Sequence, residues 1–251
     1  MEQQKCFNVP CARCGKPIVL QNFDEHMHGV FASFARSLAA NVICDECAEK
    51  AKAEEQAKRD AEWKEKLPSL YLEAGIPTAF TLMTEAKRQD VAKLIWQHRF
   101  ENLFITGDSG TGKSTSACRV LMRMIENGWY VKYMKFSTFI DKIRDCKMRR
   151  PDEYSDITQV EVFYDKLKQY KVLCIDEIAG KTKTGENVME ILFDLIDAAY
   201  SGTICPVWLI GNVRQNSMDM LFGEETESVM RRLQSFRFRQ IGLTMEGISQ
   251  N

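Results

Sequence analysis

The sequence contains no run of about 18 apolar residues, so it predicts no helix that crosses a membrane. Its first ten residues also lack the apolar segment of a secretory signal peptide. Both features that mark membrane or exported proteins are therefore missing. We expect a cytoplasmic protein that makes no membrane contact.

Net charge is almost absent as well. The 34 lysines and arginines nearly balance the 35 aspartates and glutamates of the 251-residue chain. This balance excludes a histone-like protein or an acidic tail, because no overall field would draw the chain to nucleic acid. Any contact with DNA must come from a local patch. The length allows one medium domain and a small additional module.

The conditions for disulfide bonding are missing too. The nine cysteines are an odd number in a long chain without an export signal, so we expect reduced thiols or metal ligands. Five of them are scattered: Cys6, Cys118, Cys146, Cys174 and Cys205. Most of these five are interpreted as small residues of a hydrophobic core.

The other four cysteines form two close pairs. Cys11 with Cys14, and Cys44 with Cys47, have the C-x₂-C spacing, and 29 residues (15–43) separate the two pairs. Two such pairs can place four thiolates around one tetrahedral Zn²⁺. Four cysteine ligands leave no open coordination position. We therefore predict a structural zinc module over residues 1–50 whose folding depends on the metal.

The spacer between the pairs leaves alternatives open. It is longer than the usual ~15–20 residues, and residues 30–43 could form an inserted helix within it. His26 and His28 are rival ligands, although two complete pairs already satisfy four-coordination. Four unrelated buried thiols are the other interpretation.

A charged segment follows this module. Residues 48–66 contain many helix formers, no glycine or proline and almost no apolar stripe, which predicts a solvent-exposed linker helix. Pro68, Gly75 and Pro77 then predict a domain boundary near residues 67–78. The expected organisation is a zinc module (1–50), a linker helix and connector (51–77) and a main domain (78–251).

Short apolar runs alternate with longer helical patterns through the main domain. The predicted strands cover residues 103–106, 130–136, 172–175, 207–210 and 236–243. The predicted helices cover residues 113–126, 137–147 and 188–200, where apolar residues recur at helical spacing. This alternation predicts an α/β fold with a mostly parallel sheet covered by helices.

A glycine-rich segment joins the first predicted strand to the first predicted helix. Residues 107–114 read G-D-S-G-T-G-K-S, a complete G-x-x-x-x-G-K-S. Its glycines let backbone N–H groups point inward, where the helix end adds positive charge for phosphate. Lys113 would reach the β- and γ-phosphates, and Ser114 would ligate Mg²⁺. The predicted ATP/ADP-binding residues are Gly107, Asp108, Ser109, Gly110, Thr111, Gly112, Lys113, Ser114 and Thr115, with Asp176 from a later strand.

Polar residues also follow the next two strands of the pattern. Asp176 could hold Mg²⁺, and Glu177 could orient and deprotonate an attacking water. Asn212 follows the neighbouring apolar strand and could hydrogen-bond the γ-phosphate or that water. Solvated acids and a turn cap are the structural alternatives. With an intact phosphate loop the pattern favours ATP hydrolysis over a nucleotide kinase.

Two adjacent arginines lie on a predicted helix near the end of the chain. Arg231 and Arg232 are about 100° apart on such a helix, so only one would normally face a given target. An arginine offered to a neighbouring subunit's γ-phosphate would stabilise developing charge there. This interpretation implies self-assembly into an oligomer, and a solvated surface pair is its alternative.

The order of these motifs resembles the AAA+ helicase loaders of bacteria and their phages, of the DnaC type, and the related IstB-like transposition helpers. The resemblance covers about residues 68–243 and implies a P-loop AAA+ sheet with flanking helices. It identifies Lys113, Ser114, Asp176 and Glu177 as Walker A and B residues. It implies that Asn212 is the sensor 1 residue, Arg232 the arginine finger and Arg231 the alternate finger.

The resemblance also implies a function in DNA replication. An ATP-dependent loader would place a replicative hexameric helicase on single-stranded DNA, with the N-terminal module docking the helicase. The alternatives are a transposition helper ATPase and a non-hydrolysing zinc adapter that acts as a clamp. Family members usually end on a nucleotide-sensing arginine, whereas residues 245–251 contain none. We therefore expect weak or partner-dependent ATPase activity.

The expected DNA contact is a basic cluster after the second predicted strand. It consists of Lys142, Arg144, Lys147, Arg149 and Arg150. Phe136 and Phe139 are nearby, and basic charge beside aromatic faces suits a groove that follows a nucleic-acid backbone. Acidic residues interrupt the cluster, so a solvated helix face is the alternative.

Overall fold

The computed structural model describes residues 6–21, 41–82, 88–148, 158–178, 186–212, 226–235, 237–244 and 248–249. The chain divides into two compact units, Met1–Lys66 and Leu67–Asn251, which are described separately below. None of the helices in these residues has both the length and the apolar character that crossing a bilayer requires.

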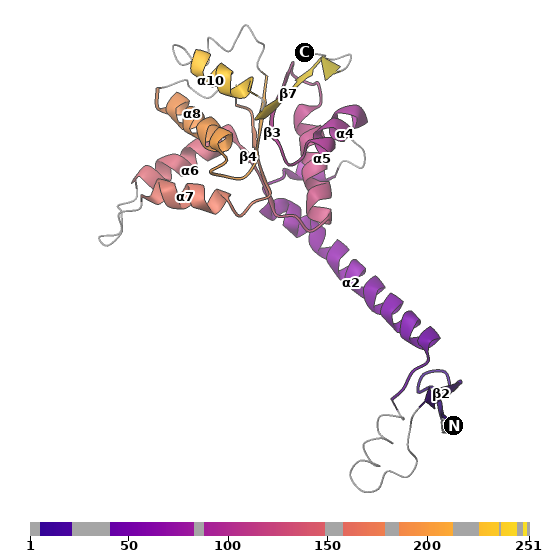
Figure 1. Cartoon of the computed structure of the whole chain (residues 1–251). Helices are drawn as coiled ribbons and strands as arrows, with labels where there is room; N and C mark the ends of the chain where they lie inside the picture. Colours follow the sequence, from indigo (N-terminus) through magenta and orange to yellow (C-terminus); the bar gives the residue numbers. More distant parts are fainter. Residues whose placement is uncertain are drawn as a thin grey trace, which may run out of the picture. The chain divides into compact units, whose positions relative to one another are not determined.

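The first unit contains a small hairpin and the start of a long helix. Strands β1 (Cys6–Pro10) and β2 (Pro17–Gln21) pair antiparallel, with Val9 opposite Ile18. Helix α2 (Asp45–Glu73) begins immediately after Cys44 (Figure 1). Because acidic side chains occupy the first turn of α2, they complement the positive end of the helix dipole.

Helix α2 is longer than the sequence predicted. It continues through Pro68 and ends at Glu73, so proline and the predicted boundary do not stop it. An interior proline costs about 3 kcal/mol, but the last turns bury apolar side chains in the second unit. Tyr71 is 8% exposed there. Gly75 follows the end of the helix with a φ of +86°, which is suited to glycine, and a Cβ at Gly75 would lie 2.3 Å from the Tyr133 carbonyl oxygen.

The second unit alternates helices and strands. In chain order they are α3 (Thr78–Thr81), α4 (Gln89–Gln97), β3 (Asn102–Gly107), α5 (Lys113–Glu126), β4 (Val131–Lys135), α6 (Phe136–Met148), α7 (Gln159–Leu167), β5 (Val172–Asp176), α8 (Glu186–Ser201), β6 (Val207–Gly211), α10 (Thr226–Leu233), β7 (Phe238–Leu243) and β8 (Ile248–Ser249). The strands and helices predicted for this unit are all present, with bounds that differ by at most two residues. Strand β7 begins two residues later than predicted, α8 begins two residues earlier, and Phe136 begins α6 instead of ending β4.

These strands form one sheet in the order β4-β5-β6-β3-β7-β8. The first five are parallel, and β8 pairs antiparallel with β7. Helices α6, α7 and α8 cover one side of the sheet, and α4 and α5 cover the other (Figure 1). The predicted α/β fold, a mostly parallel sheet with flanking helices, is confirmed.

Strand residues alternate between two apolar clusters, one on each side of the sheet. Leu173 and Ile175 pack toward α6 and α8, whereas Val172 and Cys174 pack toward α5. Cys118 and Cys174 are fully buried and Cys205 is 6% exposed, which confirms that these scattered cysteines are core residues. Burial on both faces explains why the strands are continuous apolar runs.

One polar side chain joins several elements at the start of β3. The Asn102 amide nitrogen donates to the carbonyl oxygens of Ala199 (3.1 Å) and Arg237 (3.2 Å). The Asn102 amide oxygen accepts from the Val207 backbone N–H at 2.9 Å. This residue therefore links the starts of β3 and β6 to the end of α8 and the residue before β7.

We predict that Asn102→Ala lowers the free energy of unfolding by about 2 kcal/mol, because the Val207 N–H loses its acceptor and two carbonyls lose their donor. Chemical denaturation of the full chain measures this change. Ser201→Ala, which removes an exposed hydroxyl from the same region, should change stability by less than about 0.5 kcal/mol. Equal effects of the two substitutions would contradict the linking role of Asn102.

Candidate nucleotide site and cysteine cluster

The phosphate loop lies between β3 and α5, and glycines fix its shape. Gly107, Gly110 and Gly112 have φ values of +143°, +83° and +87°, which other residues rarely adopt. A Cβ on Gly107 would lie 2.3 Å from the Leu243 carbonyl oxygen. The loop is therefore pressed against the end of β7, and its conformation requires glycine.

Lys113 lies inside this loop. Its side chain is buried, and its ammonium donates to the carbonyl oxygens of Gly107 (2.8 Å) and Asp108 (2.7 Å). The Thr111 hydroxyl donates to the same Asp108 carbonyl at 2.8 Å. Burial lowers the pKa of Lys113, and the charges of Asp176 and Asp108 oppose this effect. Phosphate oxygens could replace the loop carbonyls as partners of the ammonium.

Helix α5 begins at Lys113, so its N-terminus faces the loop. Unpaired N–H groups and the helix dipole at such an end favour phosphate. Ser114 and Thr115 are half-buried in the first turn. The Ser114 hydroxyl and the Asp176 carboxylate are hard oxygen donors of the kind that Mg²⁺ prefers.

Asp176 ends β5 as a buried carboxylate, 3% exposed. It accepts hydrogen bonds from the Tyr133 hydroxyl and from the Glu177 backbone N–H, both at 2.7 Å. Burial, with the Asp176 charge as the next cause, raises the pKa of Tyr133. Tyr133 is not among the predicted site residues, although strand alternation places it opposite Cys174 on the face that Asp176 shares.

Glu177 has a strained backbone and an ionic partner. Its φ is +61°, a conformation that costs a residue other than glycine about 1–3 kcal/mol. Its carboxylate pairs with the Lys135 ammonium at 2.9 Å, and this hydrogen bond raises the pKa of Lys135. Lys135 is also absent from the predicted site residues; it ends β4 directly opposite Asp176 in the register. Glu177 is therefore held toward β4 in this structure.

Asn212 is exposed directly after β6. Strand β6 lies between β3 and β5 in the sheet, so Asn212 follows the strand that separates the phosphate loop from Asp176. All three positions are at the carboxyl ends of parallel strands, where ligands of such sheets bind. The strand order brings the predicted nucleotide residues to one edge.

The two arginines of α10 have different surroundings. The Arg232 guanidinium donates to an Asp197 carboxylate oxygen and to the Ser228 hydroxyl, both at 2.7 Å, and lies over the Phe193 ring. Arg231 is 77% exposed and pairs with Glu227 one turn earlier, an exposed pair that contributes little. Of the two, Arg231 is the one presented to solvent.

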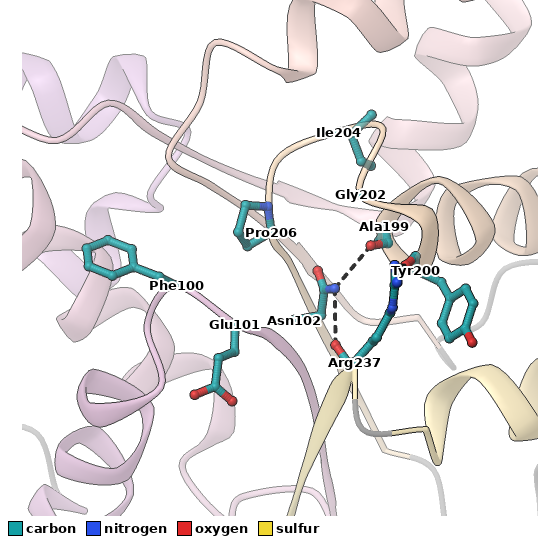
Figure 2. A pocket seen from close by; sticks show the side chains of 9 residues that line it. All are labelled: Phe100, Glu101, Asn102, Ala199, Tyr200, Gly202, Ile204, Pro206 and Arg237. Atoms are coloured by element: carbon teal, nitrogen blue, oxygen red, sulfur yellow. Dashed lines mark hydrogen bonds between the residues drawn. The ribbon is translucent and has the colours of Figure 1, made fainter.

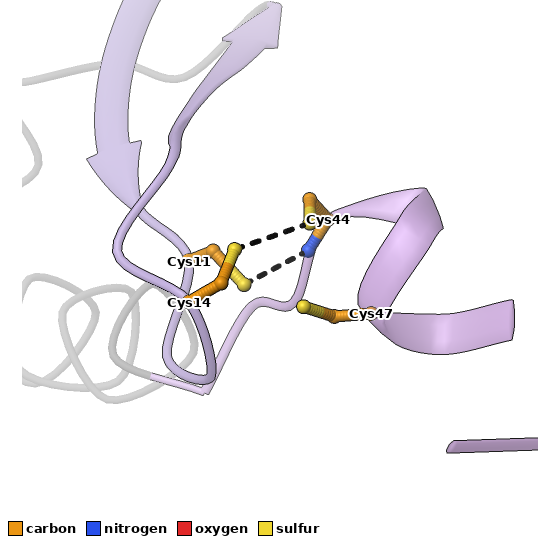
Figure 3. A group of neighbouring side chains, drawn as sticks. All are labelled: Cys11, Cys14, Cys44 and Cys47. Carbon is orange, nitrogen blue, oxygen red and sulfur yellow. Dashed lines mark hydrogen bonds between the residues drawn. The ribbon is translucent and has the colours of Figure 1, made fainter. Parts of the chain in front are cut away.

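The four paired cysteines come together in the first unit. Figure 3 shows Cys11 and Cys14 facing Cys44 and Cys47, and their sulfur atoms all lie within 4.8 Å of one another. Zn–S bonds of about 2.3 Å in a tetrahedron place sulfurs about 3.8 Å apart. The Cys14 and Cys44 sulfurs are 3.6 Å apart, so the four thiols fit a zinc ion. The rival ligands His26 and His28 lie outside the described residues.

Backbone N–H groups beside the cluster favour the thiolate form of Cys11, whereas the cysteine neighbours of Cys47, Cys14 first, raise the pKa of Cys47 to about 12. The backbone N–H groups of Cys44 and Arg13 donate to the Cys11 sulfur at 3.3 and 3.4 Å. The Cys44 N–H is the main cause that lowers the pKa of Cys11 to about 6. The Arg13 guanidinium pairs with Glu54 and donates to the Cys47 carbonyl, so the first C-x₂-C loop is tied to the start of α2.

The basic cluster of α6 differs from the expectation in one respect. Lys142, Arg144 and Lys147 are exposed, whereas Arg149 and Arg150 lie outside the described residues. Phe136 and Phe139 are 2% and 0% exposed because they pack into the core. The expectation that these two rings would offer stacking faces beside the basic side chains is therefore wrong.

Comparison with known proteins gives two curated relatives. The chain is 29% identical over 105 residues to a protein of Sinorhizobium fredii described as an insertion-sequence ATP-binding protein, over 42% of this chain and 32% of the relative. It is 24% identical over 134 residues to an IS21-like insertion-sequence ATP-binding protein of Bacteroides fragilis, over 49% of this chain and 63% of the relative. The matches thus span about one third to two thirds of these relatives. No protein-family model matches the chain.

Solved structures with a similar fold include a DnaC helicase loader, at 15% identity and a TM-score of 0.45, over 65% of this chain and 94% of that one. A DnaI structure is similar at 14% identity and a TM-score of 0.44, over 67% and 87%. The two curated relatives, both described as insertion-sequence ATP-binding proteins, support the resemblance that the order of the sequence motifs indicated.

We predict that the purified chain carries one Zn²⁺ and that Cys11→Ser with Cys14→Ser removes it, because two thiolates cannot complete the tetrahedral site. Elemental analysis of the full chain measures the stoichiometry, and limited proteolysis should show earlier cleavage within residues 1–66 of the variant. Cys146→Ser, which alters a half-buried thiol outside the cluster, should keep the metal. A metal-free parent chain would contradict the zinc assignment.

Proposed function

We propose that the second unit binds and hydrolyses MgATP and that the chain uses this cycle as a DnaC/IstB-like AAA+ switch on DNA. The observation that carries this proposal is the shared edge of the sheet, where the strand order gathers the phosphate loop, the Asp176–Glu177 pair and Asn212. A phosphate loop alone is enough to bind nucleotide, whereas hydrolysis also requires acidic residues beside the loop that hold Mg²⁺ and orient the attacking water.

Each residue has a physical role in this proposal. The Lys113 ammonium would exchange loop carbonyls for β- and γ-phosphate oxygens. Ser114 and Asp176 would hold Mg²⁺, which neutralises phosphate charge when bound. Glu177 would orient the attacking water and accept its proton, and the Asn212 amide would donate to the γ-phosphate or position the water.

The structure favours Arg231 over Arg232 as the residue offered to a neighbouring subunit. Asp197 and Ser228 of the same chain already hold Arg232, which is 26% exposed. Arg231 would lose only its exposed ion pair with Glu227 when it binds the γ-phosphate of a nucleotide in a neighbouring subunit. We therefore propose Arg231 as the finger in an assembled oligomer and Arg232 as a residue that fixes α10 against α8.

The curated relatives favour one biological role over the other. Both are described as insertion-sequence ATP-binding proteins, so we propose a helper in transposition that acts on duplex DNA. The second candidate is a loader that places a replicative hexameric helicase on single-stranded DNA. Its support is the order of the sequence motifs together with the cysteine cluster, which could scaffold a helicase-docking surface in the first unit.

We predict that Glu177→Gln lowers kcat for ATP hydrolysis about 100-fold or more while ATP affinity stays nearly constant, because the base is lost and the loop is intact. Lys113→Ala should weaken ATP binding about tenfold or more, because the loop loses its buried cation. Glu65→Gln, on the exposed part of α2, is the matched control and should behave as the parent.

The ATP hydrolysis assay also distinguishes the transposition helper from the helicase loader when it is run without DNA, with single-stranded DNA, with duplex DNA and with a hexameric helicase. Stimulation by duplex DNA supports the transposition helper. Stimulation that needs single strands and the helicase supports the loader. Equal and negligible turnover by the parent and Glu177→Gln under every condition would overturn the hydrolysis proposal and favour a clamp that only binds nucleotide.

We predict that Lys135→Met raises the ATP turnover of the isolated chain about threefold or more. The substitution removes the ion pair between Lys135 and Glu177, so the Glu177 carboxylate is no longer held away from the phosphate loop. Steady-state kinetics of the variant and of the double variant with Glu177→Gln measure the effect. The double variant should be as slow as Glu177→Gln alone. Slower turnover by Lys135→Met would show instead that the lysine assists hydrolysis.

A further inference from the structure

Two adjoining grooves lie at the end of the sheet opposite to the phosphate loop. Their volumes are about 360 and 960 Å³, and they share Phe100, Gly202, Ile204 and Pro206. The residues just before the five parallel strands line them in the spatial order of the sheet: Tyr130, Lys171, Pro206, Glu101 and Arg237. At a strand spacing of about 4.8 Å, these strand starts form a track roughly 19 Å long.

Aromatic rings stand along this track. Tyr130 is 57% exposed and stacks on Tyr170 with ring centroids 4.8 Å apart. Phe100 is 40% exposed and meets the ring of Trp129 edge to face at 5.0 Å. Figure 2 shows Phe100 on one side of the smaller groove and Tyr200 on the other. Both side chains are more exposed than large aromatic residues usually are, so they offer aromatic surface to a ligand.

Basic groups lie beside the rings. The Lys171 ammonium is 5.4 Å from the centre of the Phe100 ring, and the Arg237 guanidinium is 5.2 Å from that of Tyr200. Lys168 also lines the larger groove. The single carboxylate in the two linings, Glu101, is already paired with Arg239 and His98. In a chain of net charge −1 the track is therefore locally positive.

We propose that this basic and aromatic track binds single-stranded nucleic acid, with bases stacked on Tyr130 and Phe100 and phosphates near Lys171 and Arg237. Single strands are held elsewhere by the same combination of stacking faces and cations. An acidic peptide would match the positive charge of the track but has no bases to stack on the aromatic rings. The aromatic rings therefore favour nucleic acid over an acidic peptide. The surface is separate from the exposed basic side chains of α6.

Nucleic-acid binding at the track does not depend on the proposed ATPase function. It is formed at the amino ends of the strands, whereas Lys113, Asp176 and Asn212 lie at or beyond the carboxyl ends. Lys113→Ala should therefore leave binding at the track intact. Loss of ATP hydrolysis and loss of track binding are consequently separable results.

Binding of a labelled oligothymidylate to the full chain, followed by fluorescence anisotropy over a range of salt concentrations, tests the proposal. Tyr130→Ser should weaken binding about tenfold, because a stacking face is lost. Lys171→Gln should reduce the slope of log affinity against log salt by about 0.7, because one phosphate contact is lost. Lys166→Gln, on α7 and outside both linings, is the matched control and should bind as the parent.

Photocrosslinking locates the strand. Oligonucleotides that contain iodouracil should form adducts on peptides with Tyr130, Tyr170 or Phe100, and equal melting temperatures would show that the exposed substitutions leave the fold intact. Adducts confined to α6, or unchanged affinity and salt slope in both variants, would overturn the proposal. It would also be overturned if the parent binds a polyglutamate peptide but no oligonucleotide, since this result would assign the track to an acidic protein.

Discussion

The position of β3 between β6 and β7 is the constraint on which the nucleotide site depends. Parallel pairing on both sides sets Gly107 opposite Leu243, and the close approach of the Leu243 carbonyl leaves no room for a side chain at that point. The loop must therefore leave the sheet with a positive φ and turn directly into α5. A slip of one residue would turn every buried strand residue to the other face, so the apolar pattern fixes this register.

Two charged side chains at the same edge are buried together with their hydrogen-bond partners. Lys113 and Asp176 are both buried, and an isolated charge in such surroundings would be costly. Loop carbonyls satisfy the ammonium, while Tyr133 and the Glu177 N–H satisfy the carboxylate. The second acid, Glu177, combines a strained backbone with an ion pair to Lys135, so its carboxylate lies beside the end of β4.

The first unit differs from the second in how it is stabilised. Within residues 9–19 and 41–66, the buried apolar side chains are Val9, Cys11 and Cys47, and a small module with so little buried apolar surface needs an additional source of stability. Four sulfurs within 4.8 Å of one another are candidate metal ligands that would supply such stability, and ion pairs from Arg13 and Lys16 to α2 tie the cysteine loop to the helix. Packing in the second unit, by contrast, comes from apolar clusters on both faces of the sheet.

The sequence by itself determined the kinds of element, the phosphate loop, the acidic pair and the paired cysteines, because each depends on spacing within a few residues. It also indicated an α/β fold from the alternation of patterns. Only the tertiary structure decided which side chains meet: Arg232 with Asp197, 35 positions away, and Lys135 with Glu177, 42 positions away. It likewise turned Phe136 and Phe139 into the core and gathered Tyr130, Lys171 and Arg237 at the opposite edge. Strand order brings such distant residues together, and no local pattern encodes it.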